Sequence, residues 1–152
     1  MIISYSTDVG RVRSENQDSV YAKQIDEKTA LLIVADGMGG HNGGKTASST
    51  AIDTISVNIL SGYTPSMTCD EIEELLRNSI NLANQNIYEA AFYNDELKGM
   101  GTTAVVALVV DDMLYTANVG DSRLYVHSGR KFTQITTDHS YVESLVSKGI
   151  IS

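Results

Sequence analysis

The stretch TTAVVALVVDDMLYTANVGDSRLYVHSGRKFTQI, residues 102–135, decides the fold class of this chain. Its apolar and β-branched residues form four short runs, and each run predicts a strand. The runs are separated only by Asp111-Asp112, by Gly120-Asp121 and by residues 128–130. Connections this short allow hairpins but no crossover helices, so an antiparallel meander is expected. The four predicted strands are residues 102–110, 113–119, 122–127 and 131–135.

Three more strands are expected upstream, at residues 2–7, 19–24 and 29–35. The third is a continuous apolar run, which is typical of a strand buried inside a sheet. It ends at Asp36, where a glycine-rich segment begins. Glycines allow positive φ angles and a close approach of the backbone to a ligand, so this segment is a candidate binding loop.

Helices are expected at residues 43–60 and 69–97. Small and apolar side chains recur every four residues in the first, which is the spacing of one helix face. In the second, Thr68 and Glu71 have the spacing of a capping box, in which each side chain satisfies a free backbone N–H. Ser140 and Glu143 repeat that spacing and predict a further helix at residues 140–149.

Composition predicts one soluble globular domain over residues 1–152, because 42% of the residues are hydrophobic and only one is proline. A formal net charge of −8 argues against a nucleic-acid partner, which needs clustered Lys and Arg. The apolar runs are too short to span a bilayer, so no membrane association is expected. The single cysteine, Cys69, cannot form an intrachain disulfide and is read as an inert thiol, and a cytoplasmic location is expected.

The expected fold class is therefore α+β, an antiparallel β-sandwich flanked by helices. The glycine-rich loop leaves two interpretations open. Residues 39–46 match the phosphate-loop pattern, in which Lys45 would contact nucleotide phosphates and Thr46 would bind magnesium. Phosphate-loop proteins need parallel strands, however, and the hairpins of residues 102–135 argue against this interpretation.

The other interpretation starts from Asp36 and Gly37, because a carboxylate and a carbonyl oxygen suit hard divalent cations. Asp18 precedes the strand at residues 19–24, and Asp121 lies in a hairpin turn. If the meander folds back beside the first strands, these acids share one rim of the sheet.

Four segments carry a resemblance to a known family. Arg13 to Asp18 (RSENQD), residues 36–41 (DGMGGH), 101–103 (GTT) and 120–123 (GDSR) resemble, in order and spacing, the metal-dependent serine/threonine protein phosphatases of the protein phosphatase 2C type, in their bacterial form. The resemblance extends to residues 137–140. It implies a hydrolase that removes phosphate from phosphoserine and phosphothreonine in proteins by metal-activated water.

The resemblance also implies roles for individual residues. Two Mn²⁺ or Mg²⁺ ions are bridged by Asp36, with the Gly37 carbonyl as a further ligand, and a third ion is held by Asp121. Asp18 acts on the metals through water, and Arg13 binds the substrate phosphate, so that Arg13, Asp18 and Asp36 are the expected catalytic residues. Implied partners are phosphorylated proteins and a cognate serine/threonine kinase, in bacterial signalling.

Some positions depart from the family pattern or are expected to be structural. Met38 stands where many eukaryotic members have a histidine proposed as general acid, and methionine has no proton to donate. Lys45 is expected to be a surface charge, and residues 101–103 are expected to serve packing. Asp138 and His139 are read as structural residues near a helix start.

The sequence ends at Ser152, before the further strands and late aspartates of the family's catalytic domain. We therefore expect the N-terminal part of a truncated catalytic domain with weak or no activity, and self-association through exposed sheet edges. The alternative is a noncatalytic remnant of the same fold that binds a phosphoprotein or another partner.

Overall fold

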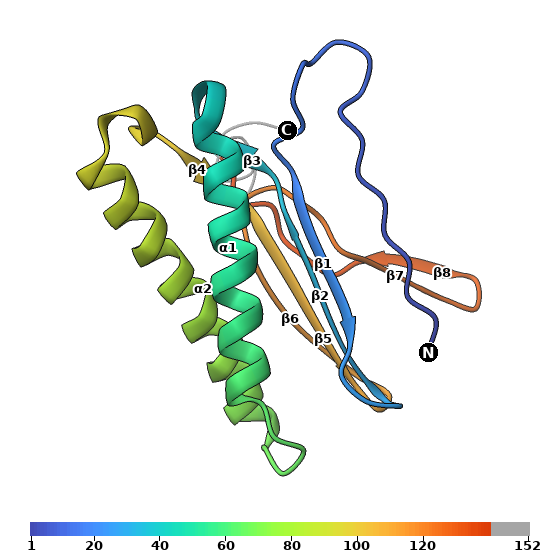
Figure 1. Ribbon diagram of the computed structural model, residues 1–152. Coiled ribbons are helices and arrows are strands. Elements are labelled where there is room, and N and C mark those ends of the chain that lie inside the picture. The colour runs from blue at the N-terminus through green and yellow to red at the C-terminus, as the bar shows by residue number, and fades with distance from the viewer. Residues whose placement is uncertain (141–152) are drawn as a thin grey trace, which may run out of the picture.

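A four-stranded antiparallel sheet forms the centre of the molecule (Figure 1). The structure, a computed structural model, describes residues 1–140, apart from the side chains of residues 41 and 42. The strand order is β1-β2-β5-β6. The bounds are β1 Ser19–Gln24, β2 Thr29–Ala35, β5 Ala104–Val110 and β6 Met113–Val119. The predictions for β1, β2 and β6 are confirmed to the residue, and the pairing of β2 with β5 joins the two halves of the chain.

Two long helices cover one face of this sheet, α1 (Gly40–Gly62) and α2 (Cys69–Tyr93) (Figure 1). The capping box at Thr68 and Glu71 is present, as predicted. The core lies between helices and sheet, where Ile33, Val106 and Leu108 pack in one cluster with Ile55 and Leu76. The α+β prediction is confirmed, and no helix in residues 1–140 is long and apolar enough to cross a membrane.

Short elements surround the end of β2. Strand β3 (Gly37–Met38) pairs with β4 (Gly101–Thr102), and the short 3-10 helix η1 (Asp95–Leu97) precedes β4. The predicted strand at residues 102–110 is therefore split, because the Thr103 amide donates a hydrogen bond to the Asp36 carbonyl instead of continuing a ladder. The helix predicted to reach residue 97 ends at Tyr93, where the Asn94 side chain accepts from the Glu96 amide and starts η1.

The last described strands form a hairpin, β7 (Tyr125–Ser128) and β8 (Lys131–Gln134), on the side of the sheet away from the helices (Figure 1). The meander prediction is correct within the β5–β6 and β7–β8 pairs but wrong between them, because β6 and β7 are not neighbours. Residues 120–124 form a loop instead, in which the Ser122 hydroxyl bonds to Thr103 and the Leu124 amide bonds to Thr136.

The predicted strand at residues 2–7 is wrong. The structure shows no strand there, and Ile2 is 99% exposed. A strand needs a neighbour to complete its hydrogen bonds, and among the described residues none pairs with this segment. The helix predicted at residues 140–149, with its capping box, lies outside the described residues except for Ser140.

Candidate metal and phosphate site

Asp36 lies where the buried strand β2 ends, and its backbone is held on both sides. The Asp36 amide donates to the Thr103 hydroxyl at 3.0 Å. Its carbonyl accepts from the Thr103 amide at 2.9 Å and from the Thr102 hydroxyl at 2.9 Å. Residues 102 and 103 therefore fix the position of Asp36, which goes beyond the packing role expected from the sequence.

Asp18 reaches Asp36 through the register of the first two strands. Ser19 pairs with Ala35, so the residue before β1 lies beside the residue after β2. The Asp18 amide donates to the Asn16 side chain at 2.9 Å, which shapes the turn before the strand. The Asp18 carboxyl group lies close enough to that of Asp36 to raise the pKa of Asp36.

The electrostatics of Asp36 reflect this crowding. Burial of its carboxyl group raises the pKa of Asp36, and the neighbouring Asp18 raises it further through its charge. The Asp121 charge also raises this pKa, while the Arg13 charge lowers it. The predicted acids therefore share one rim of the sheet, and their repulsion favours a bound cation.

The loop of residues 120–124, which carries Asp121, is held by Thr103, the same residue that holds Asp36. The Thr103 hydroxyl lies 2.7 Å from the Ser122 hydroxyl, so one side chain links both loops. Gly120 has a φ of +94°, and a Cβ there would lie 2.7 Å from the Thr103 methyl carbon. Only glycine fits at this position without strain.

Arg13 lies on the wall of the candidate site. A cavity of about 660 Å³ is lined by Arg13, Glu15, Asp36, Gly37 and Met38, among other residues. Arg13 thus shares an open cavity with Asp36, while Asp18 and Asp121 are not among its lining residues. This is the arrangement expected for a phosphate-binding arginine beside metal-binding carboxylates.

The donor set fits a divalent cation only in part. Asp36 and Gly37 offer a carboxylate and a carbonyl oxygen, the ligand types of hard cations. Within residues 1–140, however, no three His, Cys, Asp or Glu side chains group closely enough to hold a metal ion. The described residues therefore supply part of a metal shell.

Sequence reasoning missed the residues that attach the Asp18 loop to α1. Lys45, expected to be a surface charge, donates to the Asp18 carbonyl at 3.0 Å and to the Ser19 hydroxyl at 3.2 Å. Ser48 donates to the Gln17 carbonyl at 2.6 Å, and the Gln17 side chain donates to the Gly40 carbonyl at 2.8 Å. These contacts cross more than twenty positions of sequence, so no local pattern signals them. The two hydrogen bonds of Lys45 explain this residue without a bound nucleotide. In addition, every strand pair of the four-stranded sheet is antiparallel, which argues against the phosphate-loop interpretation.

Asp138 and His139 have structural roles in the described residues. The Arg123 Nε–H is shared between the two carboxylate oxygens of Asp138. A terminal nitrogen of Arg123 donates a further hydrogen bond of 2.6 Å to Asp138. The Arg123 guanidinium holds the pKa of Asp138 below its usual range. The His139 amide donates to the Gly120 carbonyl at 2.8 Å. Both residues thus attach the segment that follows β8 to the loop of residues 120–124, which carries Asp121.

Comparison with solved structures supports this fold. Stp1, a serine/threonine phosphatase from Staphylococcus aureus, superposes with a TM-score of 0.86 at 40% identity, over 97% of this chain and 57% of that one. The catalytic domain of the serine/threonine protein phosphatase PstP, solved with two manganese ions, gives a TM-score of 0.76 at 33% identity, over 94% of this chain and 58% of that one.

Sequence comparison gives the same answer. The Listeria monocytogenes serine/threonine phosphatase stp is 39% identical over all of this chain and 60% of its own length. The Streptococcus pneumoniae protein phosphatase PhpP is 36% identical over 98% of this chain and 59% of its own length. The chain thus spans about 60% of the length of the curated relatives it matches. The profile of the protein phosphatase 2C family matches residues 10–147, and with the fold and the site in place this chain belongs to the protein phosphatase 2C family.

Proposed function

We propose that the rim formed by Asp18, Asp36 and Asp121 is the metal-binding part of a protein serine/threonine phosphatase. The observation that carries the proposal is that Asp36, whose carboxyl group is close to that of Asp18, lines the same cavity as Arg13. Neighbouring carboxylates near a third acid favour a cation, and an arginine on the cavity that Asp36 lines favours a phosphate. The bacterial phosphatases that resemble this chain along nearly its whole length support the same reaction.

Each residue has a defined task in this proposal. Asp36 and the Gly37 carbonyl would hold two Mn²⁺ or Mg²⁺ ions, Asp18 would orient water at this site, and Asp121 would hold a third ion. When bound, the metal pair supplies an activated water and neutralises phosphoryl charge. Arg13 binds two phosphoryl oxygens and orients the phosphorus toward the carboxylate rim. Met38 has no proton to donate, so the serine or threonine alkoxide that leaves the phosphorus would take its proton from water and become a hydroxyl.

For this chain alone we expect slow turnover. A site's affinity for a divalent cation follows the number and charge of its ligands, and within residues 1–140 no group of three ligating side chains is complete.

The proposal includes phosphorylated proteins as substrates, a cognate serine/threonine kinase as counterpart and a cytoplasmic setting. Self-association is proposed at the outer edges of β1 and β6, which pair with no other described strand.

The test combines manganese calorimetry with phosphate release from a phosphothreonine peptide, using Asp36→Asn as the matched variant. We expect manganese binding to the parent chain that weakens in Asp36→Asn, and slow release that this variant abolishes. Equal manganese binding by both chains, with no release from either, would refute the proposal. A phosphopeptide that still bound without manganese would then favour the noncatalytic alternative.

A further inference from the structure

A second cavity adjoins the candidate site. It has a volume of about 680 Å³ and lies between the C-terminal half of α2 and the β3–β4 pair. Its lining is mostly apolar and includes Met38, Ile87, Tyr88, Ala91, Phe92 and Met100. A cavity of this size and composition is suited to an organic side chain rather than to an ion. We call it the α2 groove.

Met100, which lines the α2 groove, packs closely on the start of α1. Gly39 has a φ of +128°, and a Cβ on it would lie 2.5 Å from the Met100 Cα. A Cβ on Gly43 would lie 3.0 Å from the Met100 side chain. Because these two glycines let Met100 pack directly on the start of α1, the groove is largely preformed.

The outer wall of the groove exposes more aromatic surface than folding requires. Tyr88 is 68% exposed and Phe92 is 71% exposed, and their rings stack with centroids 6.4 Å apart. Single exposed apolar residues are ordinary, but an adjacent pair that lines a cavity marks a binding surface. The groove is also bordered by Asp95 and Lys98, one charge of each sign, which gives no preference for an anionic surface such as a membrane.

Continuity with the candidate site identifies the occupant. Met38 lines both cavities and is 58% exposed, so the α2 groove is within reach of a polypeptide whose phosphorylated residue lies beside Arg13. We propose that the α2 groove binds a bulky apolar side chain of the substrate protein, close in sequence to the phosphorylated residue. This inference rests on the proposed function, and it names a feature of the substrates that the site selects.

The test measures the binding of labelled peptides to the chain by fluorescence anisotropy. The probes are labelled peptides that carry a phosphothreonine analogue with a methylene group in place of the bridging oxygen, which cannot be hydrolysed. One leucine is placed in turn at each position from about three residues before to about three after the analogue, since an extended chain advances about 3.3 Å per residue. An alanine peptide is the reference.

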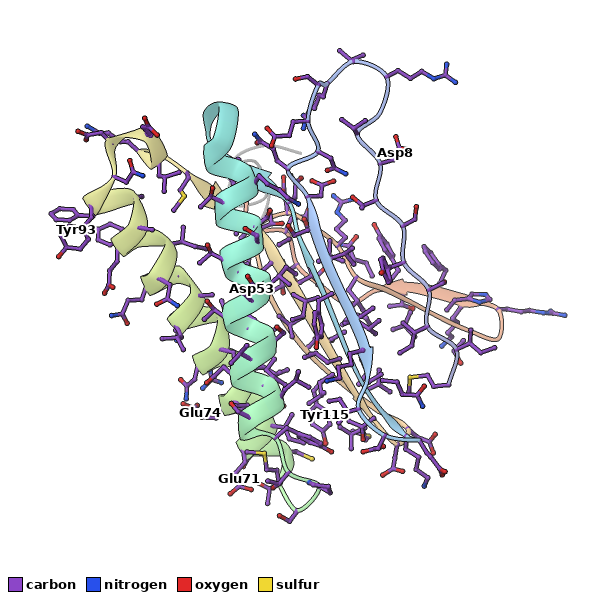
Figure 2. The ribbon with its side chains drawn as sticks, viewed as in Figure 1. Asp8, Asp53, Glu71, Glu74, Tyr93 and Tyr115 are labelled. Atoms are coloured by element: carbon purple, nitrogen blue, oxygen red, sulfur yellow. The ribbon has the colours of Figure 1, made fainter. Side chains whose placement is uncertain are left out.

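We expect one leucine position to tighten binding about tenfold, the factor given by partial burial of one leucine side chain. Phe92→Ala and Tyr88→Ala should remove this gain while leaving the binding of the alanine peptide unchanged. The matched control is Tyr5→Ala, because Tyr5 is 67% exposed and does not line the groove, whereas the Tyr93 ring packs edge-to-face on Phe92 with centroids 5.1 Å apart. Figure 2 shows Tyr93 at the end of α2, pointing away from the sheet.

The outcomes separate this proposal from the phosphatase proposal. Equal binding of all peptides, or no binding of any, overturns the α2 groove as a substrate site, whatever the phosphate-release assay shows. A leucine gain that Tyr5→Ala also removes overturns it as well. Self-association of the parent chain that is lost in Phe92→Ala would assign the groove to a second copy and would likewise overturn it. A leucine gain confined to the groove residues, together with no phosphate release and equal manganese binding by the parent chain and Asp36→Asn, would leave the groove standing and the phosphatase proposal refuted.

Discussion

The Asp36 amide donates a hydrogen bond of 3.0 Å to the hydroxyl of Thr103, a residue 67 positions later in the chain. That hydroxyl lies 2.7 Å from Ser122, next to Asp121. Thr103 is 4% exposed, so water cannot replace either contact. One buried threonine therefore joins the two loops that carry candidate metal ligands.

Replacing Thr103 with valine should lower both stability and manganese affinity. Valine keeps the shape but leaves the Asp36 amide and the Ser122 hydroxyl without a partner, at a cost of about 1–3 kcal/mol. Urea denaturation measures the first effect and calorimetry the second. Thr133→Val is the matched control, because Thr133 is exposed on β8. Equal unfolding midpoints for the two variants would contradict this role.

Gly37→Ala should destabilise the chain strongly. A Cβ on Gly37 would overlap the Gly44 carbonyl oxygen and would lie 2.6 Å from the Gln17 carbonyl oxygen. Both contacts are with backbone, which cannot move aside, so a loss of about 3 kcal/mol is expected in urea denaturation. Gly101→Ala is the control, since its Cβ would meet only the Met38 side chain at 3.6 Å. Similar losses for both alanine variants would show that the fit at Gly37 is not tight.

The sequence predicted best what depends on neighbours in the chain. The β2 run and the Thr68–Glu71 capping box are local patterns, and both are present. The shared rim of acids was predicted only on the condition that the meander folds back beside the first strands, and the long-range pairing of β2 with β5 meets that condition. The errors arose where distant groups compete for hydrogen bonds. Thr103 leaves the β4–β5 run to bond Asp36, and no local pattern announces that choice.

Lys45→Met should weaken manganese binding while leaving the stability of the fold nearly unchanged. The Lys45 ammonium group holds the Asp18 carbonyl at 3.0 Å, so its removal frees the loop that presents the Asp18 carboxylate. Lys131→Met removes the same charge at an exposed site on β8 and serves as the control. Calorimetry should show weaker manganese binding for Lys45→Met than for Lys131→Met. Thermal protection by ATP that depends on Lys45 would instead revive the phosphate-loop interpretation.

The Arg123–Asp138 pair should make stability depend on pH in the acid range. The Arg123 guanidinium lowers the pKa of Asp138 in the folded state, so the folded chain binds a proton here less readily than the unfolded chain. The stabilisation is fully present above the unfolded pKa of about 3.9 and is lost as the pH falls through the lower, folded pKa.

Urea midpoints of the parent chain and of Asp138→Asn, measured from neutral pH into acid, check this prediction. The two midpoints should differ most near neutral pH and converge as the pH falls through the lowered pKa of Asp138 in the folded chain, where the parent chain also loses the carboxylate charge. Glu74→Gln is the control, because the Glu74–Arg77 pair is 55% and 63% exposed whereas the Asp138 side chain is only 14% exposed. Exposed pairs contribute little, so this variant should follow the parent chain at every pH. A gap between parent and Asp138→Asn that stayed constant into acid would mean that shape and packing, rather than charge, hold Asp138 against Arg123.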